Sequence, residues 1–279
     1  DFEYALILSG DQLYQMDFNE MIKALKKIHL KLLPIINLPT IITSLKNIPR
    51  YFKFLVNYIN YKKLSEHENI SLFDIYPCLN DQSSDSQTGK GHYFYQDLWA
   101  LKHIYKTSPK IHIDIGSRID GFSAQCSVIC PVEFIDYRPV NLRIDNFKMV
   151  QGLITNLPYE SKSVSSISSL HVVEHIGLGR YGDPVDPQGS HNAIKELQRV
   201  LAPGGALLFS VPIGKERVQF NAHRIFNPKT IIDEFDELKL TSFSVIDDNN
   251  NFQQNTDFAK DWSNQQYACG LFSFTREHD

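Results

Sequence analysis

Short apolar runs that end in an acid or a glycine recur in the second half of the chain and predict buried strands. Four strands are predicted in this way, at residues 110–116, 132–136, 163–170 and 206–212. Helices are predicted between them, at residues 122–129 and 193–201. Strands that alternate with helices are typical of an α/β sheet in which most strands run parallel. Residues 270–275 alternate apolar and polar positions, so we predict an antiparallel edge strand there.

The stretch from Lys23 to Lys63 differs from the rest because it carries nine Lys or Arg residues and no Asp or Glu, together with many apolar residues. Its prolines are expected to break it into short pieces, the last of them a helix at residues 51–64. Two interpretations stay open. The stretch is a helical appendage that packs its apolar side on the main domain, which the prolines favour, or it makes peripheral contact with an anionic membrane.

These patterns divide the chain into three parts. Residues 91–279 form the α/β domain, and residues 23–90 form a basic, apolar helical appendage with a polar linker. Residues 1–22 match neither part. Within them, residues 5–17 (ALILSGDQLYQMD) resemble a metal-binding segment of ADP-glucose pyrophosphorylases, in which Asp11 would hold Mg²⁺. The rest of that family's nucleotide site is not visible, so we interpret the segment as a fusion scar, an artefact or a coincidental strand.

Composition excludes several classes of protein. With 279 residues, 42% hydrophobic and 22% charged, the chain has an ordinary globular composition. A net charge of −4 argues against a nucleic-acid partner. No apolar run reaches the ~20 residues that span a bilayer. Four cysteines are too few for a disulfide framework, and their spacing predicts no metal site, so we expect a cytoplasmic protein, with membrane association as the alternative.

Two acids at the ends of consecutive predicted strands indicate a nucleotide site. Asp114 and Asp136 lie 22 residues apart, as expected when one strand leads through a helix to the next in a nucleotide-binding sheet. Gly116 allows the backbone to approach a ligand closely, and a carboxylate at position 136 can accept both hydroxyls of a ribose. Arg118 occupies the middle of the turn, which weakens a pyrophosphate site. Its guanidinium pairs with a cofactor carboxylate or with Asp120.

The motifs that follow resemble those of class I S-adenosylmethionine-dependent methyltransferases. N-L-P at 156–158, H-V-V-E-H at 171–175 and R-V-L-A-P-G-G at 199–205 follow D-I-G at 114–116 in the order of that family. More narrowly, GHYFYQDLW (91–99), DIGSRIDGF (114–122) and FNAHR (220–224) resemble the DUF268 group within it. The resemblance implies a Rossmann-like, mostly parallel sheet with helices on both faces and S-adenosyl-L-methionine as the cofactor.

The same resemblance implies roles for individual residues. Asp114, Gly116 and Ser117 would line the amino-acid end of the cofactor, and Asp136 would bind its ribose. Tyr137, Asn156 and Leu157 would lie around the adenine. His171 is placed at the mouth of the site, and Tyr95 would cover the sulfonium as part of a lid.

Three residues are candidates for proton transfer to or from an acceptor. His175 and His223 are candidate general bases, because imidazole titrates near neutral pH, and Glu174 could orient a histidine or accept a proton itself. Residues 171–175 also fit the H-x-x-E-H pattern of zinc proteases. That pattern needs a helix, whereas here it follows a predicted strand, so no zinc site is predicted from it.

We therefore predict a methyltransferase that acts on a small-molecule or glycan acceptor, with O-methylation as the expected reaction. A methyltransferase-fold binding module without catalysis is the alternative, since Arg118 departs from the usual turn. A fragment of a sugar-nucleotide nucleotidyltransferase is a remote third interpretation.

Overall fold

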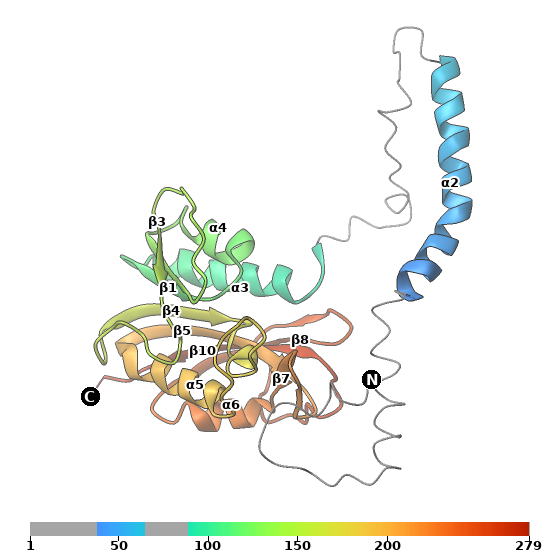
Figure 1. The fold of residues 1–279 in the computed structure, drawn as a ribbon. Helices are drawn as coiled ribbons and strands as arrows, with labels where there is room; N and C mark the ends of the chain where they lie inside the picture. The colour runs from blue at the N-terminus through green and yellow to red at the C-terminus, as the bar shows by residue number, and fades with distance from the viewer. Residues whose placement is uncertain (1–37, 65–88, 279) are drawn as a thin grey trace, which may run out of the picture. The chain divides into compact units, whose positions relative to one another are not determined.

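A computed structural model describes residues 38–64 and 89–278, and the predictions made for residues 1–22 lie outside this range. The chain divides into two units, residues 1–86 and 87–279. In the first unit the described element is helix α2 (Leu38–Leu64), and the second unit holds the sheet (Figure 1). Among the described residues, no helix combines the length and the hydropathy needed to cross a membrane.

Eight strands of the described chain form one sheet in the order β3-β2-β1-β4-β5-β10-β8-β9. Their bounds are β1 (His112–Ile115), β2 (Val132–Asp136), β3 (Phe147–Gln151), β4 (Val164–Leu170), β5 (Leu201–Ile213), β8 (Lys239–Ile246), β9 (Phe252–Gln253) and β10 (Ala268–Thr275). Strands β1 to β5 run parallel, whereas β10 runs antiparallel to both β5 and β8, and β9 closes the edge antiparallel to β8. The predicted α/β fold with a mostly parallel sheet and an antiparallel edge is confirmed.

Helices cover both faces of this sheet (Figure 1). On one face lie α3 (His92–Thr107), the single turn η4 (Ile119–Ser123) and the short α4 (Ala124–Cys126), and on the other lie α5 (Gly189–Val200) and α6 (Pro228–Glu234). Neighbouring residues of β5 point to opposite faces, as a strand requires. Leu208 packs with α3 and α4, whereas Leu207 and Phe209 pack with α5.

The order of the strands creates a switch point in the middle of the sheet. From β1 the chain moves outward to β2 and β3, and then returns to place β4 on the other side of β1. The loops that leave β1 and β4 therefore diverge at the carboxyl ends of these strands. In open α/β sheets, ligands bind in the crevice formed at this point.

The strand predicted at residues 270–275 is not at the edge. It belongs to β10, which lies between β5 and β8 and is buried along nearly its whole length. The polar positions that suggested a solvent-facing side are accommodated inside the protein. Ser273, for example, accepts a hydrogen bond from the Thr241 hydroxyl at 3.0 Å. Alternation of polar residues is therefore not a sign of solvent when the polar side chains are small and paired.

Helix α2 also corrects a prediction, because Pro49 lies within it and does not end it. A proline removes one backbone donor and favours a bend, but it does not prevent helix on either side. Large apolar side chains of its carboxyl-terminal half are exposed, among them Phe52 and Val56.

A chain of buried polar groups joins β1 to β4. The His112 ring lies 2.8 Å from Ser166 Oγ through Nδ1 and 2.9 Å from Ser168 Oγ through Nε2. Ser168 in turn donates to Asp114 Oδ1 at 2.5 Å. Since the Ser168 hydroxyl proton is used for Asp114, His112 donates from Nε2 and accepts from Ser166 at Nδ1. A neutral imidazole satisfies every partner, and burial lowers the pKa of His112 to about 3.

This arrangement predicts a pH dependence of stability. The pKa of His112 is lower in the folded chain than the ~6.5 of an unfolded one. The contribution of this group to the free energy of unfolding is therefore complete above pH ~6.5 and falls as the pH drops toward 3. Between pH 7 and pH 5 the wild type should lose about 2 kcal/mol of unfolding free energy through this group. His112→Gln keeps two hydrogen-bonding atoms but cannot titrate, so urea unfolding should show a correspondingly weaker pH dependence. The control is His191→Gln in α5, and equal pH dependence in wild type and His112→Gln would contradict the prediction.

Candidate functional site

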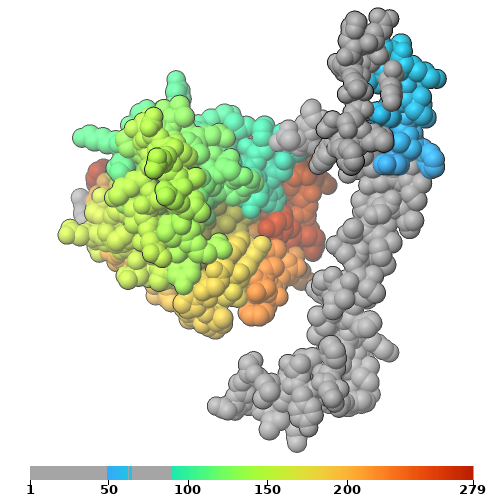
Figure 2. All heavy atoms as spheres, turned by 45° about the horizontal axis from the view of Figure 1, so that its top comes forward, coloured from blue at the N-terminus to red at the C-terminus, as the bar shows by residue number. Residues whose placement is uncertain are grey.

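A cavity of about 710 Å³ lies at the carboxyl ends of the central strands. It is called the strand-end pocket here, and its wall includes the residues that follow four successive strands. These are Gly116 and Ser117 after β1, Asp136 and Tyr137 after β2, Leu153 after β3 and His171 after β4. The volume is within the ~300–1,000 Å³ typical of small-molecule sites. Figure 2 shows the green to yellow-green part of the chain, which contributes much of this wall, as one continuous portion of the sheet unit.

The turn after β1 is built on a buried carboxylate. Asp114 is fully buried and accepts hydrogen bonds from Ser117 Oγ at 2.6 Å, from Ser168 and from Ser123. Burial outweighs these donors and raises the pKa of Asp114 to about 6. Ser117 Oγ also accepts from the Leu170 backbone N–H at 3.1 Å, so the turn is fastened to the end of β4.

Gly116 shapes the floor of the pocket. Its φ is +67°, and a Cβ there would lie 3.1 Å from Val172 Cγ1. Both facts favour glycine, since an L side chain is strained in this region and the space is already filled. Gly116 also lines the strand-end pocket, so a ligand there can approach its backbone with no side chain of residue 116 between them.

Arg118 settles one alternative left open by the sequence. Its guanidinium forms a two-point pair with Asp120, with Nη2–Oδ2 at 2.7 Å and Nε–Oδ1 at 3.0 Å. It also lies 4.5 Å above the centre of the Tyr93 ring. Arg118 and Tyr93 both line the strand-end pocket, so together they form one of its walls.

Asp136 closes β2 with a half-buried carboxylate that lines the pocket. One oxygen, Oδ1, accepts the backbone N–H of Arg138 at 2.7 Å, which fixes the orientation of the group. No hydrogen bond within the described chain is assigned to Oδ2, so it can accept from a ligand. Next to it the wall is apolar, with Val140, Leu142, Ile144, Leu153 and Ile154.

The end of β4 holds a strained histidine. His171 has a φ of +57°, which is uncommon for a residue with a side chain. Its Nδ1–H donates to Glu174 Oε1 at 2.7 Å, and Glu174 is fully buried. Burial alone would lower the pKa of His171, but the Cys269 sulfur and the Glu174 carboxylate beside it raise that pKa well above its usual value. Strain of this kind is concentrated at functional sites.

His175 presents one ring nitrogen for chemistry. Its Nδ1 lies 2.7 Å from the Ala222 carbonyl oxygen, so this nitrogen carries the proton and donates. Nε2 is then the unprotonated nitrogen of the ring, and it lies 3.7 Å from Glu174 Oε1. Burial lowers the pKa of His175, which keeps the ring neutral near pH 7.

A loop after η5 (Val173–His175) forms the remaining wall, and its acidic residues are committed to its own backbone. Asp183 accepts from the N–H of Gly177 at 3.0 Å and from that of Tyr181 at 3.1 Å. The Asp186 carboxylate accepts from the Gln188 N–H at 2.9 Å and from the Asn192 side-chain amide at 3.2 Å. These carboxylates therefore shape the loop.

The structure brings half of the predicted site residues to the pocket wall. Six line it, namely Gly116, Ser117, Asp136, Tyr137, His171 and His175. Asp114 and Glu174 are fully buried and hold lining residues in place.

Four predicted residues lie elsewhere. Tyr95 stacks on Phe252 with ring centroids 5.6 Å apart, so it packs on the sheet and does not form a lid. Asn156 is exposed and Leu157 is in the core, because the chain turns back at Leu153 and puts residues 152–155 at the pocket. His223 is half-buried against Tyr267, with ring centroids 4.7 Å apart and outside the pocket wall.

Sequence reasoning missed Tyr93 and the apolar wall. Tyr93 belongs to the same aromatic run as Tyr95, and two residues of helix turn a side chain to a nearly opposite direction. Only the register of α3 on the sheet decides which tyrosine meets the pocket. Val140, Leu142 and Ile144 alternate with polar residues as in a strand, but the structure forms no strand at residues 138–144. The pattern therefore did not indicate that this segment lines a pocket.

Comparisons with known proteins agree with the sequence resemblance. The family model described as "Caenorhabditis protein of unknown function, DUF268" matches residues 143–244, which confirms the predicted similarity to that group. No curated protein matches the chain. 

Several solved structures are similar in fold. The N-methyltransferase NodS from Bradyrhizobium japonicum WM9, in complex with S-adenosyl-L-homocysteine, is 15% identical, with a TM-score of 0.47 over 67% of this chain and 88% of that one. A putative sarcosine dimethylglycine methyltransferase from Galdieria sulphuraria is 13% identical (TM-score 0.47; 66% and 85%). The [4+2]-cyclase SpnF is 10% identical (TM-score 0.49; 70% and 86%). Similarities at this level concern the fold and leave the activity to be argued from the site.

The glycines of the pocket loop give a testable contrast. Gly177 and Gly182 both have positive φ, +78° and +82°. A Cβ on Gly177 would overlap the Asp186 carbonyl, whereas a Cβ on Gly182 would meet nothing within 4 Å. We expect Gly182→Ala to cost ~1–2 kcal/mol of unfolding free energy from backbone strain alone. Gly177→Ala should cost at least ~1–3 kcal/mol more, because the loop must move. Denaturant unfolding of both variants measures the difference, and equal losses would contradict this account of the loop.

Proposed function

We propose that this protein is an S-adenosyl-L-methionine-dependent methyltransferase that transfers a methyl group to an oxygen of a small-molecule or glycan acceptor. The observation that carries the proposal is the strand-end pocket, in which a ribose-binding type of carboxylate, Asp136, faces the same cavity as the Gly116 turn. This cavity lies at the switch point of the sheet, where α/β folds bind nucleotides.

The residues present fit an adenosyl group. Asp136 keeps one carboxylate oxygen free while the other is held by Arg138 N–H, so it can accept hydrogen bonds from a ribose without losing its own orientation. The apolar wall beside it, which includes Leu142 and Ile154, suits the flat face of an adenine. Tyr137 is 41% exposed and lines the pocket, so its ring can pack on the same base.

The other end of the pocket fits an amino-acid group. Gly116 and Ser117 offer backbone in close reach, and Asp114 beneath them fixes the turn. Arg118 is the cation on this side, and it is already paired with Asp120. Since that pair is largely exposed, a ligand carboxylate can compete with Asp120 for the guanidinium at small cost.

When bound, S-adenosyl-L-methionine supplies a methyl group already activated on a sulfonium. The protein then has to align the acceptor and take up its proton. His175 is the residue suited to the second task, because Ala222 holds the proton on Nδ1 and leaves Nε2 as the proton acceptor. Glu174 acts as a positioning residue, since its carboxylate is buried, is bonded to His171 and lies 3.7 Å from His175 Nε2.

The other expectations drawn from the sequence stay predictions. A methyltransferase-fold binding module without catalysis is the alternative to the enzyme, and cytoplasmic location and the absence of a nucleic-acid partner rest on composition. Peripheral membrane contact through residues 23–63 also stays a prediction. The basic and apolar side chains of the described half of α2 are compatible with it.

Cofactor binding is tested by calorimetry with S-adenosyl-L-methionine and S-adenosyl-L-homocysteine. We expect saturable binding of both, weakened at least ~10-fold in Asp136→Asn, because the amide loses the charge that strengthens hydrogen bonds to the ribose. The control is Asp233→Asn. Asp233 is an acid on α6 that lies outside the pocket, so this variant should bind both compounds like the wild type. Absence of binding to both compounds, with a folded protein by circular dichroism, would remove the proposal.

Catalysis is tested by measuring the S-adenosyl-L-homocysteine formed when the protein and S-adenosyl-L-methionine are incubated with each of a panel of hydroxyl-bearing small molecules and glycans. With an acceptor identified, His175→Asn should lower turnover by ~10²-fold or more while cofactor affinity stays within about two-fold. Asparagine can still donate to Ala222, so the variant removes the base and keeps its anchor. His191→Asn is the control. Cofactor binding without turnover on any acceptor would favour the binding module, and full turnover in His175→Asn would place the base elsewhere.

A further inference from the structure

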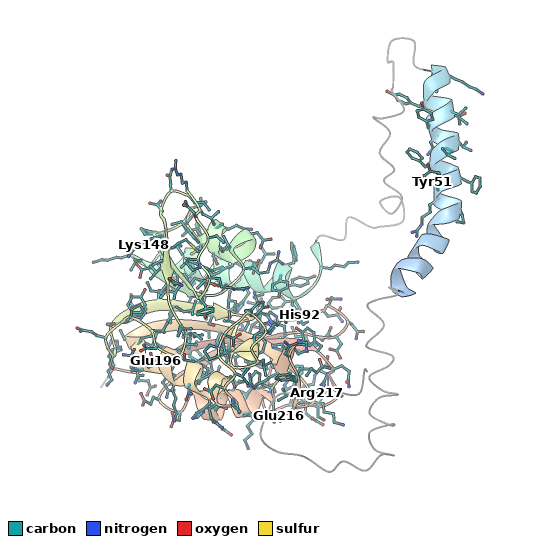
Figure 3. All side chains as sticks on the ribbon, in the orientation of Figure 1. Tyr51, His92, Lys148, Glu196, Glu216 and Arg217 are labelled. Atoms are coloured by element: carbon teal, nitrogen blue, oxygen red, sulfur yellow. The ribbon has the colours of Figure 1, made fainter. Side chains whose placement is uncertain are left out.

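Three potential metal ligands from separate elements converge beside the strand-end pocket. His92 begins α3, His171 follows β4 and Cys269 lies in β10, and one ligand atom from each lies within 4.8 Å of the other two. Figure 3 labels His92 at the start of α3, beside the strands. We propose that His92, His171 and Cys269 bind a Zn²⁺ ion. Two imidazoles and a thiolate are a donor set that suits this metal.

The first supporting observation is an unpartnered nitrogen. His171 uses Nδ1 for Glu174, so Nε2 is the nitrogen left for a metal. This atom is buried and has no hydrogen-bond partner in the described chain, although the side chain is only 3% exposed. Buried polar atoms are nearly always paired, so an orphan of this kind indicates a missing ion or water.

The second observation concerns the sulfur. Cys269 is a fully buried free cysteine whose sulfur lies beside His171, and its contact with the Gly270 carbonyl, at 3.9 Å, is at the outer limit for a thiol. Cys126 and Cys130 differ, because their sulfurs lie 3.9 Å from each other in another part of the core. Among the cysteines that the structure describes, Cys269 is the one whose sulfur lies beside two histidines.

The surroundings match those of a metal ligand. A histidine that binds zinc usually donates its other N–H to a carboxylate, which fixes the ring and makes it more basic, and Glu174 occupies that place behind His171. Zn²⁺ with one thiolate and the Glu174 carboxylate forms a unit with no net charge. Burial of such a unit avoids the penalty of an isolated ion.

The distances require a modest closure. Tetrahedral zinc places its nitrogen and sulfur ligands about 3.4–3.6 Å apart, so the atoms must approach by up to about 1.3 Å. His92 is held for this by ring stacking, on His171 at 5.4 Å and on Tyr267 at 5.3 Å. We expect this approach to come from rotation of the His92 side chain, which is half-buried and stands at the start of α3.

The ion would fasten the beginning of α3 to β4 and β10. Tyr93, the residue after His92, lines the strand-end pocket, as does His171. Metal binding would therefore fix two parts of the pocket wall. The inference does not rest on the proposed methyl transfer, and its test uses no cofactor.

The experiment uses the full chain after treatment with a chelator, titrated with Zn²⁺ and separately with Co²⁺. We expect one ion per chain, a cobalt spectrum with tetrahedral bands and a thiolate charge-transfer band, and a higher thermal midpoint with Zn²⁺. Cys269→Ser should lose the charge-transfer band, and Cys130→Ser, which removes another buried thiol, should keep it.

His92→Asn provides the second variant, because His92 is only half-buried and its replacement spares the core. It should weaken Zn²⁺ binding at least ~10-fold and abolish the rise of the thermal midpoint, even if Cys269→Ser fails to fold. The proposal is overturned if the wild type binds no stoichiometric metal. It is also overturned if the cobalt spectrum is the same in His92→Asn as in the wild type. The histidines would then form only a hydrogen-bonded group beside a thiol.

Discussion

The burial of one carboxylate, Asp114, constrains the centre of this molecule. A charged group in the interior is tolerated only when donors surround it, and here three serine hydroxyls do so. One of the three, Ser117, also receives the backbone N–H at the end of β4. The position of Gly116 and Ser117 in the pocket is therefore set by a polar network below the pocket floor. The shape of the pocket at Gly116 and Ser117 therefore depends on hydrogen bonds to Asp114, which is itself fully buried.

That network also explains why β4 carries so many serines. Val164–Leu170 has four of them, and in isolation such a segment reads as a partly exposed strand. Ser166 and Ser168 instead serve His112 and Asp114 on the neighbouring strand. Each pair is local in space and more than fifty residues apart in sequence. A pattern of apolar residues could predict the strand, but its buried hydroxyls acquire a meaning only when β1 lies beside it.

At the site, too, the sequence could predict positions that depend on a local pattern and could not predict those that depend on contacts between distant segments. Asp136 and Gly116 could be placed at the sheet edge from the sequence, because Asp136 is the last residue of its strand and Gly116 directly follows its own strand. Tyr95 and Asn156 were placed wrongly because their positions depend on packing of α3 and on the tightness of a turn. The antiparallel partner of β5 was likewise undetermined, since the order of strands in a sheet is a tertiary property.

The small ribbon formed by β6 (Arg217–Gln219) and β7 (His223–Ile225) shows how a peripheral element becomes part of the site. Ala222 lies in the turn between β6 and β7, and its carbonyl fixes the tautomer of His175. Arg224 on β7 donates to the Ile176 carbonyl at 2.6 Å, one residue after His175. The histidine is thus held through its ring and through the backbone that follows it, both times from the ribbon. Under the proposed function, in which His175 is the general base, the ribbon would set which ring nitrogen is available for proton transfer.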